Sequence, residues 1–315
     1  MKTIALLTDL NRQGILTDQQ LHVLSDLHLE RRFSLHDELR ACLYAGVLFI
    51  LAGLGFTIKA YFAQLGDIAV IGSLGLCTLG AFCYCFLKGK AYSTEAVAPP
   101  NMIFDYLLFF GCTVYSLEIA YIETRFQPLA DLWVHDLLIS SALFFFFAYR
   151  FDNRLVLSLA LSTLAAWFGF KMSPDFFHFQ QYHRLYAIAY ALLLFLTGSL
   201  LYRRSIKRHF LDIYLNFTIH FLFLALISGV IQYKVFSLYL PALAICCAIA
   251  AAYGLRAKRF LYLLYAMVYG YAGLGIVVAD ILSGEEGPLF IYFIFSSIGV
   301  VGSLYVLSRK FREES

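Results

Sequence analysis

Long apolar stretches alternate with short charged gaps along almost the whole chain. About ten of these stretches are long enough to cross the roughly 30 Å hydrocarbon layer of a bilayer, which takes about 20 helical residues. Continuous apolar runs favour helices over the alternating strands of a closed barrel, because backbone groups in lipid must be paired within the segment. The pattern therefore predicts an all-α, polytopic membrane bundle of about ten helices. The expected spans lie near residues 40–58, 68–87, 103–122, 131–149, 154–170, 184–202, 210–231, 236–254, 260–282 and 288–307.

The composition supports a membrane protein and argues against a soluble domain. Hydrophobic residues make up 61% of the chain and charged residues 14%, whereas soluble domains have about 45–50% and 25%. The net charge of +3 is small, and it gives no reason to expect a nucleic-acid partner. The expected surroundings are the lipid bilayer.

The basic residues are concentrated in alternate gaps between the spans. About 19 of the 24 Lys and Arg residues fall at the N-terminus, at the C-terminus and in the gaps near residues 89, 152, 206 and 257. By the positive-inside rule these gaps and both termini are cytoplasmic. They are called the predicted inner end below, and the opposite gaps the predicted outer end. The basic turns are also expected to attract anionic lipid head groups.

Residues 1–38 form the only long polar segment, and the sequence predicts a helical hairpin head there. The expected organisation is this head, a transmembrane bundle over 39–308 and a cytoplasmic tail over 309–315. Gly14 is expected to end the first helix of the head, and Thr17 with Gln20 forms a capping-box pattern for the second. About 35 residues are too few for a core of their own, so the apolar faces of the head are expected to lie on the bundle, on lipid or on another chain, which would make a protein partner at 1–38 one of three alternatives.

The start of the chain resembles a known family. Residues 10–20 read LNRQGILTDQQ and residues 44–55 read YAGVLFILAGLG. This opening resembles a family of bacterial polytopic membrane proteins catalogued as domain of unknown function 2157, over roughly the first 90 residues. The resemblance implies a bacterial inner-membrane location and an N-terminal helical head. It implies no activity and no catalytic residues.

A few ionisable residues lie within the expected spans, where they are costly and so become functional candidates. His220 is the deepest, and it is expected to face the bundle interior, since a lipid-facing imidazole would lose its hydrogen bonds to water. Tyr262, Tyr265 and Tyr269 share one face of a later span. The other intramembrane candidates, all in the predicted outer third, are Glu118, His135, Asp136 and Asp280.

These residues leave three functional classes open. The sequence contains no metal-site spacing, no paired intramembrane aspartates and none of the hydrolase motifs, so neither a catalytic residue, a metal nor a cofactor is predicted. A non-enzymatic scaffold or sensor with a docking head fits the scarcity of deep charge. The alternative is a small-molecule or proton-coupled permease using His220 and the outer carboxylates, and a membrane enzyme ranks third.

The topology can be tested with reporter fusions. A reporter that is active only outside the cytoplasm should be active after Phe126 and Glu286, and inactive after Lys90 and Arg208, because basic residues are retained on the inner side. Reporter activity in whole cells is the measurement. The reverse pattern at these four positions would contradict the predicted orientation.

Overall fold

The computed structural model describes residues 10–21, 36–128, 133–172, 181–233, 238–282 and 286–314. Within these ranges the regular structure is helical throughout. Besides short helical turns at 10–12 and 18–21, the elements are α3 (His36–Leu65), α4 (Asp67–Lys88), α5 (Met102–Phe126), α6 (Val134–Phe151), α7 (Arg154–Met172), α8 (Gln181–Arg203), the 3₁₀ turn η2 (Arg208–Phe210), α9 (Leu211–Tyr233), α10 (Tyr239–Arg256), α11 (Phe260–Ile281) and α12 (Glu286–Glu314).

Most of these helices are built to cross a bilayer. In the described residues, 8 helices are long and apolar enough to do so. They are α4, α5, α6, α8, α9, α10, α11 and α12, and two shorter apolar helices cover Cys42–Thr57 and Arg154–Gly169. The protein is therefore a multi-pass integral membrane protein. The span count of about ten remains a prediction.

The chain divides into two compact units, Met1–Val70 and Ile71–Ser315, and each is described by itself. In the first unit, Gly14 adopts a left-handed φ of 75°, which glycine reaches without steric cost. The amide of Gln20 donates to Thr17 Oγ1 at 3.3 Å, and the amide of Thr17 donates to Gln20 Oε1 at 3.0 Å. These reciprocal bonds form the capping box that the sequence predicts.

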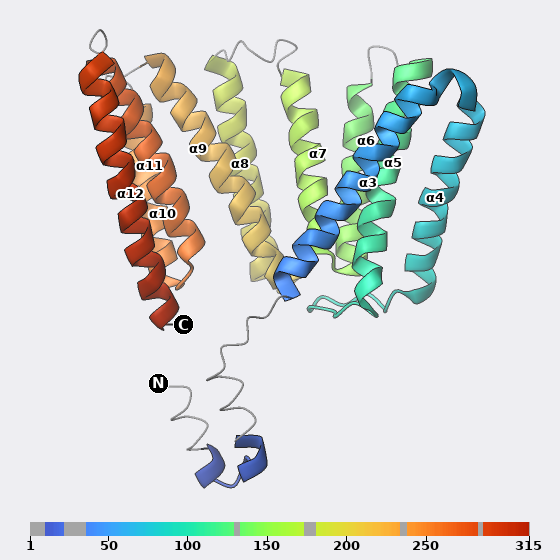
Figure 1. Cartoon of the computed structure of the whole chain (residues 1–315), viewed down its shortest axis with the longest axis horizontal. Helices are drawn as coiled ribbons and strands as arrows, with labels where there is room; N and C mark the ends of the chain where they lie inside the picture. The colour runs from blue at the N-terminus through green and yellow to red at the C-terminus, as the bar shows by residue number, and fades with distance from the viewer. Residues whose placement is uncertain are drawn as a thin grey trace. The chain divides into compact units, whose positions relative to one another are not determined.

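The second unit is assembled from antiparallel helical hairpins (Figure 1). The pairs α6–α7, α8–α9 and α10–α11 pack along their lengths. Helix α9 also packs against α10 and α11, α7 touches both α5 and α9, and α12 lies on α11. Because these helices are joined by short turns, the groups at each helix end are brought close together, and the polar clusters described below lie at or near such ends.

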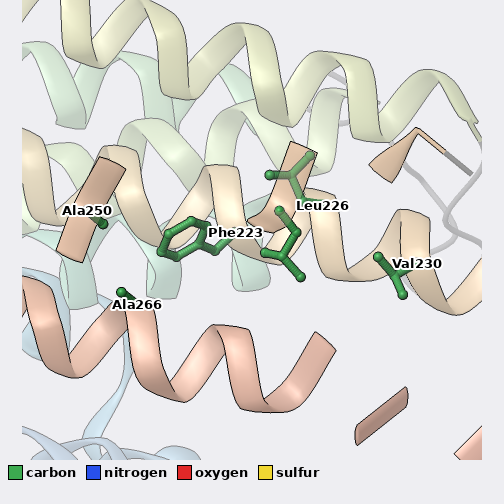
Figure 2. Close-up of a cluster of buried hydrophobic side chains, with 6 residues drawn as sticks. Phe223, Leu226, Val230, Ala250 and Ala266 are labelled. Carbon is green, nitrogen blue, oxygen red and sulfur yellow. The ribbon is translucent and has the colours of Figure 1, made fainter. Parts of the chain in front are cut away.

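A buried apolar cluster lies between α9, α10 and α11. Phe223, Leu226 and Val230 of α9 belong to one buried cluster with Leu243, Ala250 and Ala266, and the two short alanine side chains lie on either side of Phe223 (Figure 2). Small residues of this kind let helix backbones approach in lipid, where the hydrophobic effect does not drive helices together. Dispersion contacts between closely fitted side chains supply the attraction instead.

Glycines extend this close packing along the hairpins. A Cβ added to Gly198 of α8 would lie 2.7 Å from the Cβ of Tyr214 on α9. A Cβ on Gly273 of α11 would collide with the side chain of Leu243 on α10. These glycines are therefore required for close contact between helices.

The capping box predicts the effect of a mutation. Thr17→Ala removes the acceptor of the Gln20 amide and should cost about 0.5–2 kcal/mol of local helix stability. Hydrogen exchange at the Gln20 and Leu21 amides should become faster. Gln19→Ala, which changes the adjacent exposed position, serves as the control, and equal exchange in both variants would contradict the capping role.

Candidate functional site

His220 lies in the middle of α9 and its imidazole points to α11; the sequence predicts that it faces the bundle interior, but not which helix it faces. Its Nδ1 lies 2.7 Å from the hydroxyl of Tyr269. Its ring packs edge-on against Tyr265, with ring centroids 4.6 Å apart. The row of tyrosines on α11 therefore supplies the hydrogen-bond partner that a mid-membrane imidazole needs.

The next polar group along α11 is separated from this pair by apolar packing. Asp280 follows Tyr269 by three turns, or about 16 Å at 1.5 Å per residue. Gly273 and Ile276 lie on the same face between them, and Leu243 of α10 packs against Gly273. Apolar side chains therefore occupy the length of α11 that a proton path from Asp280 to His220 would use.

A separate cavity, mostly apolar in its lining but with two carboxyl groups in its wall, opens among α5, α6 and α7, near the predicted outer end. Its volume is about 350 Å³. Its wall carries two carboxyl groups, Glu123 and Asp136, and the indole of Trp133. Within the described residues, Oε2 of Glu123 is buried without a hydrogen-bond partner. The remaining wall residues are Ser116, Ile119, Ala120, Leu137, Ser140, Ser162, Thr163 and Ala166.

Two hydroxyls of this cavity wall, Ser116 and Thr163, are left with only acceptor capacity toward the cavity. Ser116 donates to the carbonyl of Cys112 at 3.1 Å, and Thr163 donates to the carbonyl of Leu159 at 2.8 Å. Each hydroxyl has thus used its only proton on its own helix and keeps free lone pairs. Together with the carboxyl groups, they make a wall that favours a donor-rich, positively charged ligand.

The other predicted outer-third residues lie elsewhere. Glu118 faces α4, where Thr78 donates to its Oε2 at 3.4 Å, and a Cβ on Gly75 would lie 3.0 Å from its Oε1. His135 and Asp280 are not part of the cavity wall. Of the candidates predicted from the sequence, Asp136 lines this cavity, and Glu123, which is not among those candidates, is the second acidic group of the same wall.

A buried ionic cluster at the predicted inner end was not anticipated from the sequence. Asp152, in the turn between α6 and α7, accepts from His209 Nε2 at 2.6 Å and lies 3.2 Å from Lys207 Nζ. Lys207 Nζ also donates to the carbonyl of Glu95 at 2.9 Å. The side chains of Lys207 and Asp152 are 1% and 4% exposed, so the pair is desolvated and depends on its partners.

This cluster ties three connections together. The loop between α4 and α5 contributes the amide of Val97, which donates to Asp152, and the carbonyl of Thr94, which accepts from the Lys207 amide at 2.7 Å. Asp152 and Lys207 both adopt left-handed φ values, 59° and 46°. Non-glycine residues pay for this conformation, and the surrounding hydrogen bonds offset the cost.

Arg184 is a second charged residue whose burial could not be predicted from its position in the sequence. It lies in the first turn of α8, at the predicted outer end, and its side chain is buried at 1% exposure. Its Nε donates to Ser228 of α9 at 3.1 Å, and its guanidinium lies 5.2 Å from the ring centre of Tyr233. Only the three-dimensional pairing of α8 with α9 shows this role.

Neither a search for metal-binding clusters nor comparison with known proteins assigns a function to this site. Among the described residues, no group of three or more His, Cys, Asp or Glu side chains could hold a metal ion. A scan against protein-family models and searches of curated proteins and solved structures find no match. The functional argument therefore depends on the residues of this chain.

The buried ion pair between Asp152 and Lys207 predicts that removing one of its charges lowers the stability of the protein strongly. Asp152→Asn keeps the shape of the side chain and leaves Lys207 buried without its counter-charge, so it should destabilise the protein by about 3–5 kcal/mol. The midpoint of unfolding by sodium dodecyl sulfate is the measurement.

A matched comparison is the exposed ion pair between Arg259 and Asp212, whose side chains are 51% and 31% exposed. Asp212→Asn should cost only about 0.2–1 kcal/mol. The double variant Asp152→Asn with Lys207→Met removes both buried charges and should recover part of the loss. Equal costs for Asp152→Asn and Asp212→Asn would show that the buried pair has no special role.

Proposed function

We propose that this integral membrane protein is a non-enzymatic sensor that binds a small organic ammonium compound in the cavity among α5, α6 and α7. The observation that carries the proposal is the buried, unpartnered Oε2 of Glu123 in a wall that also holds Asp136. An acidic oxygen without a partner costs free energy in a low-dielectric site. A bound cation with N–H donors would remove that cost.

The wall also indicates which kind of cation fits. Carboxyl oxygens and hydroxyl lone pairs accept hydrogen bonds, so a primary ammonium group with three N–H donors is better suited than a quaternary one. Trp133 adds an aromatic face, and such faces attract cations. At about 350 Å³, the cavity has room for a short aliphatic amine.

The structure around the cavity favours sensing over permeation. One and two turns from Ser116 along α5, Cys112 and Leu108 are fully buried, as are Phe144 of α6 and Leu157 of α7. An apolar layer therefore separates the cavity from the predicted inner end. The ionic cluster of Asp152, Lys207 and His209 lies beyond that layer, and His220 belongs to a different group of helices, α9 to α11.

The remaining parts of the proposal come from the sequence. The head at 1–38 is proposed as the segment through which a cytoplasmic protein partner is engaged. The resemblance to the bacterial family catalogued as domain of unknown function 2157 supports a bacterial inner-membrane location. The cytoplasmic placement of both termini is part of the same proposal and rests on the distribution of basic residues.

The test uses 1,4-diaminobutane as the probe, with the full chain in lipid nanodiscs. Isothermal titration calorimetry should show saturable binding of the diamine, and much weaker binding of 1,4-butanediol and tetramethylammonium. Glu123→Gln should lower the affinity for the diamine about tenfold or more, because a hydrogen bond to a charged group contributes about 1.5–3 kcal/mol. Glu118→Gln is the matched control on the same helix, since Glu118 faces α4, and it should bind normally.

Two results would overturn the proposal in different ways. Equal affinity for the diamine and the diol, or no saturable binding, would show that the cavity is not a binding site for an ammonium group. Labelled diamine could instead enter proteoliposomes faster than empty liposomes, and Glu123→Gln could reduce this uptake. That result would show that the protein is a permease and not a sensor.

A further inference from the structure

An apolar groove runs along the predicted inner half of α8, α9, α10 and α11, apart from the cavity described above. Its volume is about 500 Å³. Phe195 of α8 and Ile249 of α10 line it, together with Phe223 and Ala250 of the packed core. Phe195 and Ile249 are 44% and 64% exposed, so the groove is open on the side that faces lipid.

The position of the groove determines which molecules can reach it. The flanking helices α8, α9, α10 and α11 all qualify as membrane spans, so the groove opens into the hydrocarbon region and not into water. Its almost wholly apolar lining fits a hydrocarbon chain, and it offers no cluster of polar groups for a water-soluble ligand.

The inner mouth of the groove is basic. Ser199 and Tyr253 line this mouth, and the next residues on the same helix faces are Arg203, four positions after Ser199, and Arg256, three positions after Tyr253. Both arginines are exposed. Arg259 follows Arg256 in the same connection but is ion-paired with Asp212, so the positive charge of this mouth comes from Arg203 and Arg256.

Two hydroxyls in the groove wall have no internal partner. Tyr262, in the first turn of α11, is 2% exposed and Thr218 of α9 is 7% exposed. Among the described residues, neither hydroxyl has a hydrogen-bond partner. Tyr262 lies at the level of the basic mouth, which is where the ester carbonyls of a phospholipid would lie and could accept its proton.

From these features we infer that the groove is a binding site for one anionic phospholipid, with an acyl chain in the groove and the phosphate at Arg203 and Arg256. The apolar lining fits the chain, the unpartnered Tyr262 hydroxyl fits an ester, and the exposed arginines fit the phosphate. A zwitterionic lipid could place an acyl chain in the groove, but it would bring no net negative charge to the arginines at the mouth. This site is independent of the proposed ammonium cavity, which lies on other helices.

The test places a tryptophan in the groove and another outside it, in a background with Trp133→Phe and Trp167→Phe. Ile249→Trp reports on the groove. Leu196→Trp is the matched control, because it is 65% exposed against 64% for Ile249 and lies outside the lining. Each position precedes the basic end of its helix, Arg203 or Arg256, by seven residues, or about 10 Å of helix rise.

Nanodiscs of phosphatidylcholine would carry increasing fractions of phosphatidylglycerol with brominated acyl chains. Quenching of Ile249→Trp should saturate at a low fraction, whereas quenching of Leu196→Trp should rise only with the bulk fraction. Arg203→Gln or Arg256→Gln should each raise the half-saturating fraction about fivefold, as expected for loss of one basic residue near an anionic surface. Arg154→Gln, an exposed basic residue at the same predicted end, should leave it unchanged.

Four results would overturn the inference. Equal quenching of Ile249→Trp by brominated phosphatidylglycerol and phosphatidylcholine would remove the selectivity. Saturation with brominated oleic acid but not with the phospholipid would make the occupant a fatty acid. Quenching of the control alone would mean that protein, such as a second copy of the chain, covers the groove. Unchanged half-saturation in both arginine variants would remove the phosphate site.

Discussion

Hydrocarbon offers no hydrogen-bond partners, and this constraint decides where nearly every polar group of the protein lies. Backbone groups are paired by helices. Serine and threonine hydroxyls bond to carbonyls one turn earlier, as Ser116 does to Cys112. His220 has Tyr269, and Arg184 has Ser228. A polar group within the membrane is therefore either hydrogen-bonded to another part of the protein or left to form its hydrogen bond with a bound ligand.

Among the described residues, some exceptions to this matching belong to residues that line hollow places, although the buried side-chain oxygen of Asn216 and the indole N–H of Trp167 do not. Glu123 lines the cavity among α5, α6 and α7, and Thr218 and Tyr262 line the apolar groove, and each of these three carries a buried oxygen without a hydrogen-bond partner. Buried polar atoms without partners are rare because each costs free energy. Their coincidence with a cavity in one case and a lipid-facing groove in the other is the reason for assigning a ligand to each. The chemistry of the two walls differs, and so do the ligands: an ammonium compound for the first and an acyl chain for the second.

Much of the helical organisation could be predicted from the sequence, because it is set by local composition. The apolar runs predict the helices, and the Thr17–Gln20 pattern predicts a capping box whose two hydrogen bonds are present. The row of tyrosines on α11 and the depth of His220 were also visible, since both follow from helical spacing. Which helix the imidazole would face was not visible, because that depends on how α9 packs against α11.

Residues brought together by distant segments could not be predicted in the same way. Asp152 and Lys207 are separated by more than fifty positions, and each looks like a solvated turn residue when its own neighbourhood is considered alone. The same is true of Glu123 and Asp136, which belong to successive helices but share a cavity only because α7 closes it. Their partnership is a property of the fold, and no pattern within one segment carries it.

The basic residues of the predicted inner end show how one compositional signal can cover two different physical roles. The positive-inside rule counts Lys207 and Arg203 equally. The structure separates them: Lys207 is buried against Asp152, so its charge is neutralised inside the protein, whereas Arg203 is exposed at the mouth of the groove. A charge that is already paired adds little to the attraction of a phosphate, while an unburied arginine at a bilayer surface keeps most of its effect. Recognition of an anionic lipid at this end therefore depends on the few exposed arginines beside the groove and not on the total number of basic residues in the turns.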